Sequence, residues 1–159
     1  MSTKIWSVIR ERGQIVVWAL LVWSSKAIPR QRFIIWLEFW ERPKTRDRIR
    51  RYMAILDNSF PLCEVNEESI NHLFRGCPFT KLVWDEFVLA IGLTSFPMIW
   101  QGIKEAVLTR AKSKKFPVST FICGFTLVIY HTWSERNARI YGRVQRTTIE
   151  VWNDVKTDC

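Results

Sequence analysis

The chain has 159 residues, of which 24 are Lys or Arg and 15 are Asp or Glu, and its formal net charge is +9. An apolar share of 48% with only 6 Gly and 6 Pro excludes a disordered or low-complexity chain, because this much apolar surface offsets the entropy lost on folding. The length fits one globular domain that needs no disulfide, and the excess positive charge favours a polyanionic partner.

Two apolar segments need to be compared with membrane segments. Residues 15–23 are too short to span a bilayer, although the basic residues before them loosely resemble those of a signal peptide. Residues 116–133 contain polar side chains, and their apolar side chains share one helical face: Phe121, Phe125, Val128 and Ile129. We therefore expect a buried helix rather than a membrane span, and an intracellular protein, either nuclear or cytoplasmic.

Helical patterns begin at Pro29, a residue that suits the first turn of a helix. Residues 33–40 are apolar on almost every face, which predicts a helix packed on both sides. A second helix is expected after Pro43 with Thr45 as its N-cap. Its expected core stripe is Ile49, Tyr52, Met53 and Leu56, and its other face carries Arg46, Arg48, Arg50 and Arg51.

More helices are expected after a turn-rich break at residues 57–61. Pro78 begins one that ends at Gly92, with an apolar face of Phe79, Val83, Phe87 and Ile91. The next carries the stripe Ile99, Ile103, Ala106 and Val107 and is followed by the basic cluster Lys112, Lys114 and Lys115. A long helix over residues 118–141 is expected to end at Gly142, and Ile149 and Trp152 indicate a short last helix. The predicted fold class is mainly α, a compact helical domain with a short irregular loop like a zinc knuckle.

The irregular loop carries the one pattern with chemical specificity, Cys63, His72 and Cys77. Thiolate and imidazole are ligands that zinc prefers, but a structural zinc site normally has four ligands. The position where a Cys-x-x-Cys pair would begin is Phe60, which cannot coordinate a metal. The spacing alone leaves two interpretations open: a metal site, or buried cysteines beside a hydrogen-bonded histidine.

Several short motifs surround this loop in a defined order: Val22-Trp23, Ile28-Pro29-Arg30, Phe33-x-x-Trp36, Arg42-Pro43-Lys44-Thr45-Arg46-Asp47-Arg48-Ile49, Leu62-Cys63, Glu68-Ser69, His72-Leu73-Phe74, Cys77-Pro78, Val83-Trp84 and Trp133-x-x-Arg136-Asn137-x-Arg139. This order resembles the reverse-transcriptase zinc-binding domain of plant LINE-type (non-LTR) retroelements. The resemblance covers approximately residues 18–141. Each motif alone is weak, but their agreement in order is specific.

The resemblance implies zinc ligands at Cys63, His72 and Cys77, with the remaining family ligand position falling on Phe60. Water, Asp57 or Glu64 is a candidate for the missing ligand, and the alternative is that Phe60 packs where a thiolate would have been. The expected domains are an N-terminal extension over residues 1–17, the zinc-binding-like domain over residues 18–92, and a C-terminal helical extension over residues 93–159 that packs on it.

Nucleic acid is the expected partner, either RNA or DNA without sequence specificity, because basic helix faces neutralise phosphates. The candidate residues are Arg46, Arg48, Arg50, Arg51, Lys112, Lys114 and Lys115, with Arg136, Arg139, Arg143 and Arg146 as further candidates. The alternative is that these residues form solvated helix faces. Most of the 9 Trp are expected in the core rather than as platforms for base stacking.

Enzymatic motifs are missing from these 159 residues, including a Tyr-x-Asp-Asp polymerase motif and a Gly-rich phosphate loop. The acidic residues Glu64, Glu67 and Glu68 fall at surface-like positions rather than in a two-metal arrangement. His131 is expected to be a hydrogen-bonded core residue. We therefore expect a non-catalytic domain without a small-molecule substrate. The alternative is a retroelement relic or a helical protein-interaction module that binds neither metal nor nucleic acid.

Overall fold

A computed structural model gives the structure of residue 19 and of residues 28–54, 59–111 and 118–159. These residues form helices joined by loops: α3 (Pro29–Phe39), α4 (Arg46–Ile49), the π-helical turn η1 (His72–Gly76), α5 (Pro78–Ala90), α6 (Trp100–Ala111), α7 (Val118–Ile140) and α8 (Thr148–Asp158). Within these ranges there is no β-strand, and one isolated bridge pairs Ser59 with Glu67. The mainly helical prediction is confirmed.

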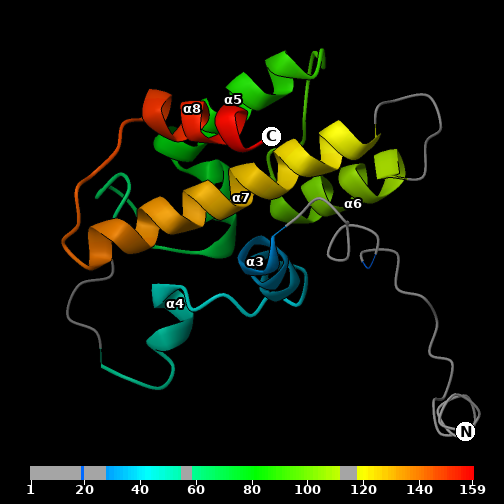
Figure 1. Cartoon of the computed structure of the whole chain (residues 1–159). Helices are drawn as coiled ribbons and strands as arrows, with labels where there is room; N and C mark the ends of the chain where they lie inside the picture. Colours follow the sequence, from blue (N-terminus) through cyan, green and yellow to red (C-terminus); the bar gives the residue numbers. More distant parts are fainter. Residues whose placement is uncertain (1–18, 20–27, 55–58, 112–117) are drawn as a thin grey trace, which may run out of the picture.

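The long helix α7 lies at the centre of the fold (Figure 1). It contacts α3, α5, α6, α8 and η1. The four side chains predicted to share its buried face are all fully buried: Phe121, Phe125, Val128 and Ile129. Leu127 and Thr126 are also buried on other faces, which is typical of a helix surrounded by its neighbours. None of the helices in the described parts of the chain is both long and apolar enough to cross a membrane.

Aromatic rings fill the core where α5, α6 and α7 meet. Trp84 of α5 stacks on Phe96 with ring centroids 5.8 Å apart, and Trp100 of α6 stacks on Phe125 at 6.5 Å. Gly124 permits close approach of the Phe87 ring, because a Cβ at this position would lie 2.6 Å from a ring carbon. Burying several aromatic rings in one cluster contributes much of the stability of a small domain.

The described tryptophans mostly pack in or against the core, as expected. Trp84 and Trp100 are buried, and three more are partly buried against the core: Trp36, Trp133 and Trp152. Trp40 is exposed. Trp6, Trp18 and Trp23 lie outside the described residues.

Helix boundaries follow the predicted proline and glycine signals. Pro29 and Pro78 occupy the first turns of α3 and α5. Gly92 and Gly142 follow the ends of α5 and α7 with φ of 70° and 64°, a backbone conformation that glycine adopts without strain. Both predicted helix ends are therefore confirmed.

The predicted helix after Pro43 is much shorter than expected. Thr45 is at its N-cap position, but α4 has only 4 residues and ends at Ile49. Of the expected core stripe, Tyr52 is 87% exposed and Met53 is 66% exposed, so the stripe is wrong; Leu56 lies outside the described residues. Arginines three or four positions apart repel one another, and a short helix without a packed face is marginal.

Three other packing predictions also need correction. Helix α3 buries Ile35, but Phe33 is exposed, so the helix is not packed on every side. In α6 the stripe is Ile103 and Val107, whereas Ile99, which precedes the helix, is exposed. In α8 the buried residues are Val151 and Val155 at i, i+4 spacing, whereas Ile149 is exposed. The apolar patterns therefore predicted where these helices lie, but near the helix ends they did not predict which side chains are buried.

Candidate metal centre

The loop over residues 59–77, called the knuckle loop below, begins with a tight turn. The bridge between Ser59 and Glu67 closes this turn, and the Phe60 amide donates to the carbonyl of Asn66 at 2.8 Å. The amides of Cys63 and Glu64 both donate to the carbonyl of Phe60. Glu64 takes a left-handed conformation with φ of 56°, which reverses the chain just after Cys63.

The second arm of the knuckle loop is η1. The amide of His72 donates to Ser69 Oγ at 3.1 Å, and the amide of Cys77 donates to the His72 carbonyl at 2.9 Å. Cys77 is the N-cap of α5, and the Thr80 hydroxyl donates to its carbonyl at 3.1 Å. The turn of η1 therefore places His72 and Cys77 toward the same side.

The two arms bring the three predicted ligands together. One sulfur or nitrogen atom from each of Cys63, His72 and Cys77 lies within 4.8 Å of the others, and Cys63 Sγ lies 3.2 Å from His72 Nε2. Zinc bonds of about 2.3 Å to sulfur and about 2.1 Å to nitrogen in a tetrahedron separate two ligand atoms by about 3.5 to 4 Å. The chemistry and spacing of these three donors therefore fit a zinc ion.

Phe60 occupies the place beside these donors. Its side chain is fully buried, and its ring packs edge-on against the His72 ring with centroids 5.0 Å apart. The expectation that Phe60 packs near the missing thiolate position agrees with this contact. Glu64 is exposed and is not part of the donor group, and Asp57 lies outside the described residues. No carboxylate in the described ranges joins the three donors.

Burial shifts the pKa values of two of the donors, His72 and Cys77. Burial lowers the pKa of His72, and the nearby Glu68 carboxylate opposes this shift, so the imidazole is neutral at pH 7 and able to bind a metal. Burial also raises the pKa of the Cys77 thiol to about 11. A metal that binds here must therefore displace a proton from Cys77, which makes its binding stronger as pH rises.

A buried ion pair ties the knuckle loop to α7. The Arg136 guanidinium donates from Nε and Nη2 to the two carboxylate oxygens of Glu68, both at 2.7 Å. Glu68 also accepts the backbone N–H of Arg46 at 2.8 Å, and Arg136 donates to the Lys44 carbonyl at 3.2 Å. Both side chains are almost completely buried, so this pair connects α4, the knuckle loop and α7 inside the fold.

A second arginine of α7 holds the turn that carries Cys63. Arg139 Nη1 lies 3.4 Å from the Pro61 carbonyl and 3.3 Å from the Leu62 carbonyl, and donates to both. Its guanidinium also lies 4.8 Å from the centroid of the Phe79 ring. Arg139 therefore positions the turn immediately before Cys63.

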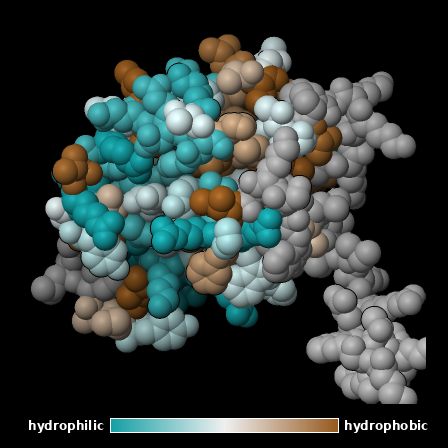
Figure 2. Space-filling view, viewed as in Figure 1, coloured by the Kyte–Doolittle hydropathy of each residue, from teal (hydrophilic) through white to brown (hydrophobic). Residues whose placement is uncertain are grey.

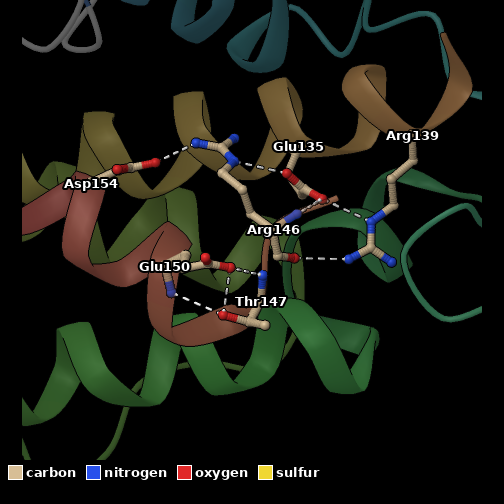
Figure 3. Close-up of polar contacts among 6 residues, drawn as sticks. All are labelled: Glu135, Arg139, Arg146, Thr147, Glu150 and Asp154. Carbon is tan, nitrogen blue, oxygen red and sulfur yellow. Dashed lines mark hydrogen bonds and ion pairs between the residues drawn. The ribbon is translucent and has the colours of Figure 1, made fainter. Parts of the chain in front are cut away.

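Glu135 organises the neighbouring arginines (Figure 3). It accepts hydrogen bonds from Arg139 Nε and Arg146 Nε at 2.9 Å each, and Arg146 also contacts Asp154 of α8. Burial disfavours the charge on Glu135, but the hydrogen bonds from the two arginines outweigh it and hold its pKa below the ordinary value. Thr147 and Glu150 cap the start of α8 next to this network.

Three of the further nucleic-acid candidates, Arg136, Arg139 and Arg146, pair with carboxylates inside the fold, whereas the fourth, Arg143, is exposed. One sequence prediction is wrong for this part of the molecule. Glu68 is fully buried rather than at the surface, whereas Glu64 and Glu67 are exposed as expected.

His131 is buried and its Nε2 lies 2.9 Å from the Asp158 carboxylate, which confirms the expected hydrogen-bonded residue.

The arginines predicted to contact nucleic acid separate into different environments. Arg46 Nη1 donates to the Ser59 carbonyl at 2.5 Å, and Arg50 lies 3.6 Å from the exposed Glu67 carboxylate. Arg48 and Arg51 line a surface groove of about 450 Å³ together with Arg42, Lys44, Pro43, Ile49, Tyr52 and Met53. We call this the α4 groove. Lys112, Lys114 and Lys115 lie outside the described residues.

Sequence reasoning missed the structural roles of Glu68 and Glu135 and the contribution of Arg42 and Lys44 to the α4 groove. The signals were present: Glu68 and the α7 arginines lie in the ordered motifs, and Arg42-Pro43-Lys44 is a basic motif beside the predicted arginine face. Side-chain partners across this sequence distance cannot be found from spacing alone.

Comparison with known proteins addresses the family of the chain. Residues 1–84 match the sequence model of a family described as zinc-binding in reverse transcriptase, which covers more than half of the chain. Neither a curated protein nor a solved structure matches the chain. The matched range contains all three clustered donors, so sequence and geometry agree on the same residues. The chain therefore belongs to the reverse-transcriptase zinc-binding family.

Proposed function

We propose that this chain is a non-catalytic, retroelement-derived domain that binds nucleic acid through the α4 groove and holds zinc in its knuckle loop. The observation that carries the nucleic-acid part is the concentration of four cationic side chains around one groove without an acidic residue: Arg42, Lys44, Arg48 and Arg51. Backbone phosphates are the ligand that such a surface attracts, because each contact releases condensed counterions.

The groove also offers apolar contacts. Tyr52 and Met53 line it and are largely exposed, so an unpaired base has a ring and a polarisable side chain to pack against. Figure 2 shows that hydrophilic residues cover much of the face seen there, with separate hydrophobic residues between them. A single strand without sequence preference is the partner that this combination favours.

Zinc binding by Cys63, His72 and Cys77 is the second part of the proposal. Zinc supplies a link between the two arms of the knuckle loop, and the three donors leave one coordination position for water or another ligand. In this proposal the metal adds to the contacts from α7 that already hold the loop, the ion pair of Arg136 with Glu68 and the hydrogen bond from Arg139 to the Leu62 carbonyl.

The nucleic-acid part is tested by the salt dependence of binding. An oligomer of about 20 deoxythymidines is titrated against the wild type and an Arg48→Ala/Arg51→Ala variant at several salt concentrations. Loss of two phosphate contacts should weaken binding and reduce the slope of log affinity against log salt by about 2. Lys81→Ala/Lys156→Ala removes two exposed charges from other helices and should leave the slope nearly unchanged. Equal slopes in the three proteins would contradict the proposal.

The zinc part is tested by native mass spectrometry of the wild type, Phe60→Cys and Phe60→Ala. One zinc per wild-type chain is the expected result, with zinc affinity more than about tenfold higher in Phe60→Cys because a fourth thiolate is added. Phe60→Ala removes the same ring without adding a ligand. Zinc found only in Phe60→Cys would contradict this part, and with no salt-dependent binding it would favour the relic or protein-interaction alternative.

A further inference from the structure

A second groove lies between α3 and α7 and shares no lining residue with the knuckle loop or the α4 groove. Its volume is about 350 Å³, at the small end of the range for ligand sites. Aromatic side chains from both helices and the following turn line it, including Phe33, Trp133 and Tyr141. We call it the α3–α7 groove. In Figure 1, α3 lies next to α7 and below it in the view, in agreement with the contacts between the two helices.

The rings of this groove are available to a ligand. Phe33 is 57% exposed and Tyr141 is 75% exposed. Phe33 is supported by the Trp36 ring at a centroid distance of 6.1 Å, and the Arg136 guanidinium lies 4.9 Å from the centroid of Trp133. Contacts inside the fold therefore hold Phe33 and Trp133, while Tyr141 presents most of its ring to solvent.

The charge around the rings is positive. Arg30 and Arg143 line the groove and are exposed, and no acidic side chain is among its lining residues. Neither guanidinium makes a hydrogen bond or ion pair with another described residue. Arg143 differs in this respect from Arg136, Arg139 and Arg146, whose charges are satisfied by carboxylates.

We propose that the α3–α7 groove binds an unpaired base of a single nucleic-acid strand, with the base against Phe33 and Tyr141 and the adjacent phosphates near Arg30 and Arg143. Stacking on aromatic rings is available to every base, and the two cations match phosphates on either side of it. The groove's small volume suits one base rather than a duplex. The inference rests on the proposed function, because the α4 groove supplies most of the phosphate contacts.

The test separates base binding from phosphate binding. The wild type is titrated with a deoxythymidine oligomer and with an abasic oligomer of the same length and charge. One stacked base should make the first bind about 5- to 100-fold more tightly than the second. Phe33→Leu/Tyr141→Leu, which keeps apolar volume but removes both rings, should remove most of this preference while leaving the affinity for the abasic oligomer nearly unchanged.

Two further measurements locate the base. Tyr52→Leu removes the exposed ring of the α4 groove and locates the base by comparison. A larger loss of the preference in Tyr52→Leu than in Phe33→Leu/Tyr141→Leu would overturn the inference. Thymidine monophosphate is the third probe, and displacement of the oligomer by an equimolar amount of it would assign the groove to a free nucleotide and overturn the assignment to a strand.

The remaining outcomes distinguish the two proposals. Absence of binding to both oligomers would overturn the proposed function itself. Binding of both oligomers with equal affinity by the wild type would leave the α4 groove as a phosphate site and overturn the inference for the α3–α7 groove. Thermal unfolding of each variant confirms that it is folded, and exposed positions such as 33 and 141 are expected to tolerate these changes.

Discussion

Arginines in two regions of this molecule have opposite surroundings. In residues 42–51, Arg42, Arg48 and Arg51 surround a groove open to solvent. In residues 136–146, Arg136, Arg139 and Arg146 are ion-paired with Glu68 or Glu135, two carboxylates that are fully buried. The same residue type therefore provides a candidate binding surface in one region and internal cross-links in the other. The difference is direct ion pairing: Arg48 is near enough to Glu38 and Glu41 to lower the pKa of each, but it forms no ion pair with a carboxylate among the described residues.

The carboxylates show the same contrast. Glu68 and Glu135 accept several hydrogen bonds from arginines, whereas Glu38 of α3 is buried without a hydrogen-bond partner for either oxygen among the described residues. Burial raises the pKa of Glu38 well above its ordinary value, and the charge of Arg48 only partly opposes this. The ion pairs of Glu68 and Glu135 with Arg136, Arg139 and Arg146, called the C-terminal network below, stabilise the fold with buried charged groups. In α3, by contrast, burial favours the neutral form of the Glu38 carboxyl group.

The largest expected effect comes from breaking the pair between Glu68 and Arg136. Glu68→Gln leaves the guanidinium buried without a countercharge, which should lower the free energy of unfolding by about 3–5 kcal/mol. Urea denaturation measures this loss. Glu67→Gln is the matched control, because the neighbouring Glu67 side chain is 71% exposed and should contribute less than about 1 kcal/mol. Similar losses in both variants would contradict the expectation that the buried ion pair contributes more to stability than the exposed one.

Glu135 provides a pH-dependent test of the C-terminal network. Its pKa is lowered in the folded protein, so the stability it contributes is present above the unfolded value of about 4.3 and is lost as pH falls through the folded value. Glu135→Gln should cost about 1–3 kcal/mol at neutral pH and progressively less in acid. Unfolding free energies measured from about pH 7 to about pH 3 give this difference. A cost that does not change with pH would contradict the assignment.

Glu38 should affect the pH dependence of stability in the opposite direction to Glu135. Because its pKa is raised in the folded protein, its ionisation reduces stability as pH rises above the unfolded value of about 4.3. Glu38→Gln should therefore stabilise the protein at neutral pH, by about 0.5–2 kcal/mol as is common for favourable single substitutions. Thermal unfolding at neutral and acidic pH measures the gain, which should shrink in acid. Destabilisation at neutral pH would show that the ionised carboxylate has a role in the fold.

The smallest effect is expected in the α4 groove. Arg51→Ala should change the free energy of unfolding by no more than about 0.5 kcal/mol, because this side chain is exposed. The same variant should weaken oligonucleotide binding at low salt. Parallel measurements of stability and binding would therefore assign Arg51 to the surface and Glu68 to the interior. A large loss of stability in Arg51→Ala would show that Arg51, like the arginines of residues 136–146, has a structural role.

The sequence predicted the helices well where local signals define them. The 3.6-residue period, prolines at helix starts and Gly92 and Gly142 at helix ends are local features, and α3, α5, α6, α7 and α8 follow them. The donor group was also predictable, since Cys63, His72 and Cys77 lie close together in sequence and resemble a known motif.

Features that depend on distant partners could not be predicted in this way. The periodicity of Ile49, Tyr52 and Met53 is helical, but Tyr52 and Met53 are 87% and 66% exposed, and none of the described helices covers them. Arg136 looks the same in sequence as Arg48, and only the approach of Glu68 from 68 residues away decides that it is buried. Local sequence patterns therefore predict the helix in which a residue lies, whereas residues distant in sequence that contact it decide whether it is buried or exposed.

The contacts between α7 and the knuckle loop set an order of events during synthesis. Glu68 and Arg136 are 68 residues apart, and Leu62 and Arg139 are 77 residues apart. At about 5–20 residues per second, the ribosome adds the first of these arginines about 3–14 s after Glu68. Once Cys77 has been added, the nascent knuckle loop has its two cysteines and its histidine but not yet its arginine contacts, so the three donors are present before the side chains that hold the loop.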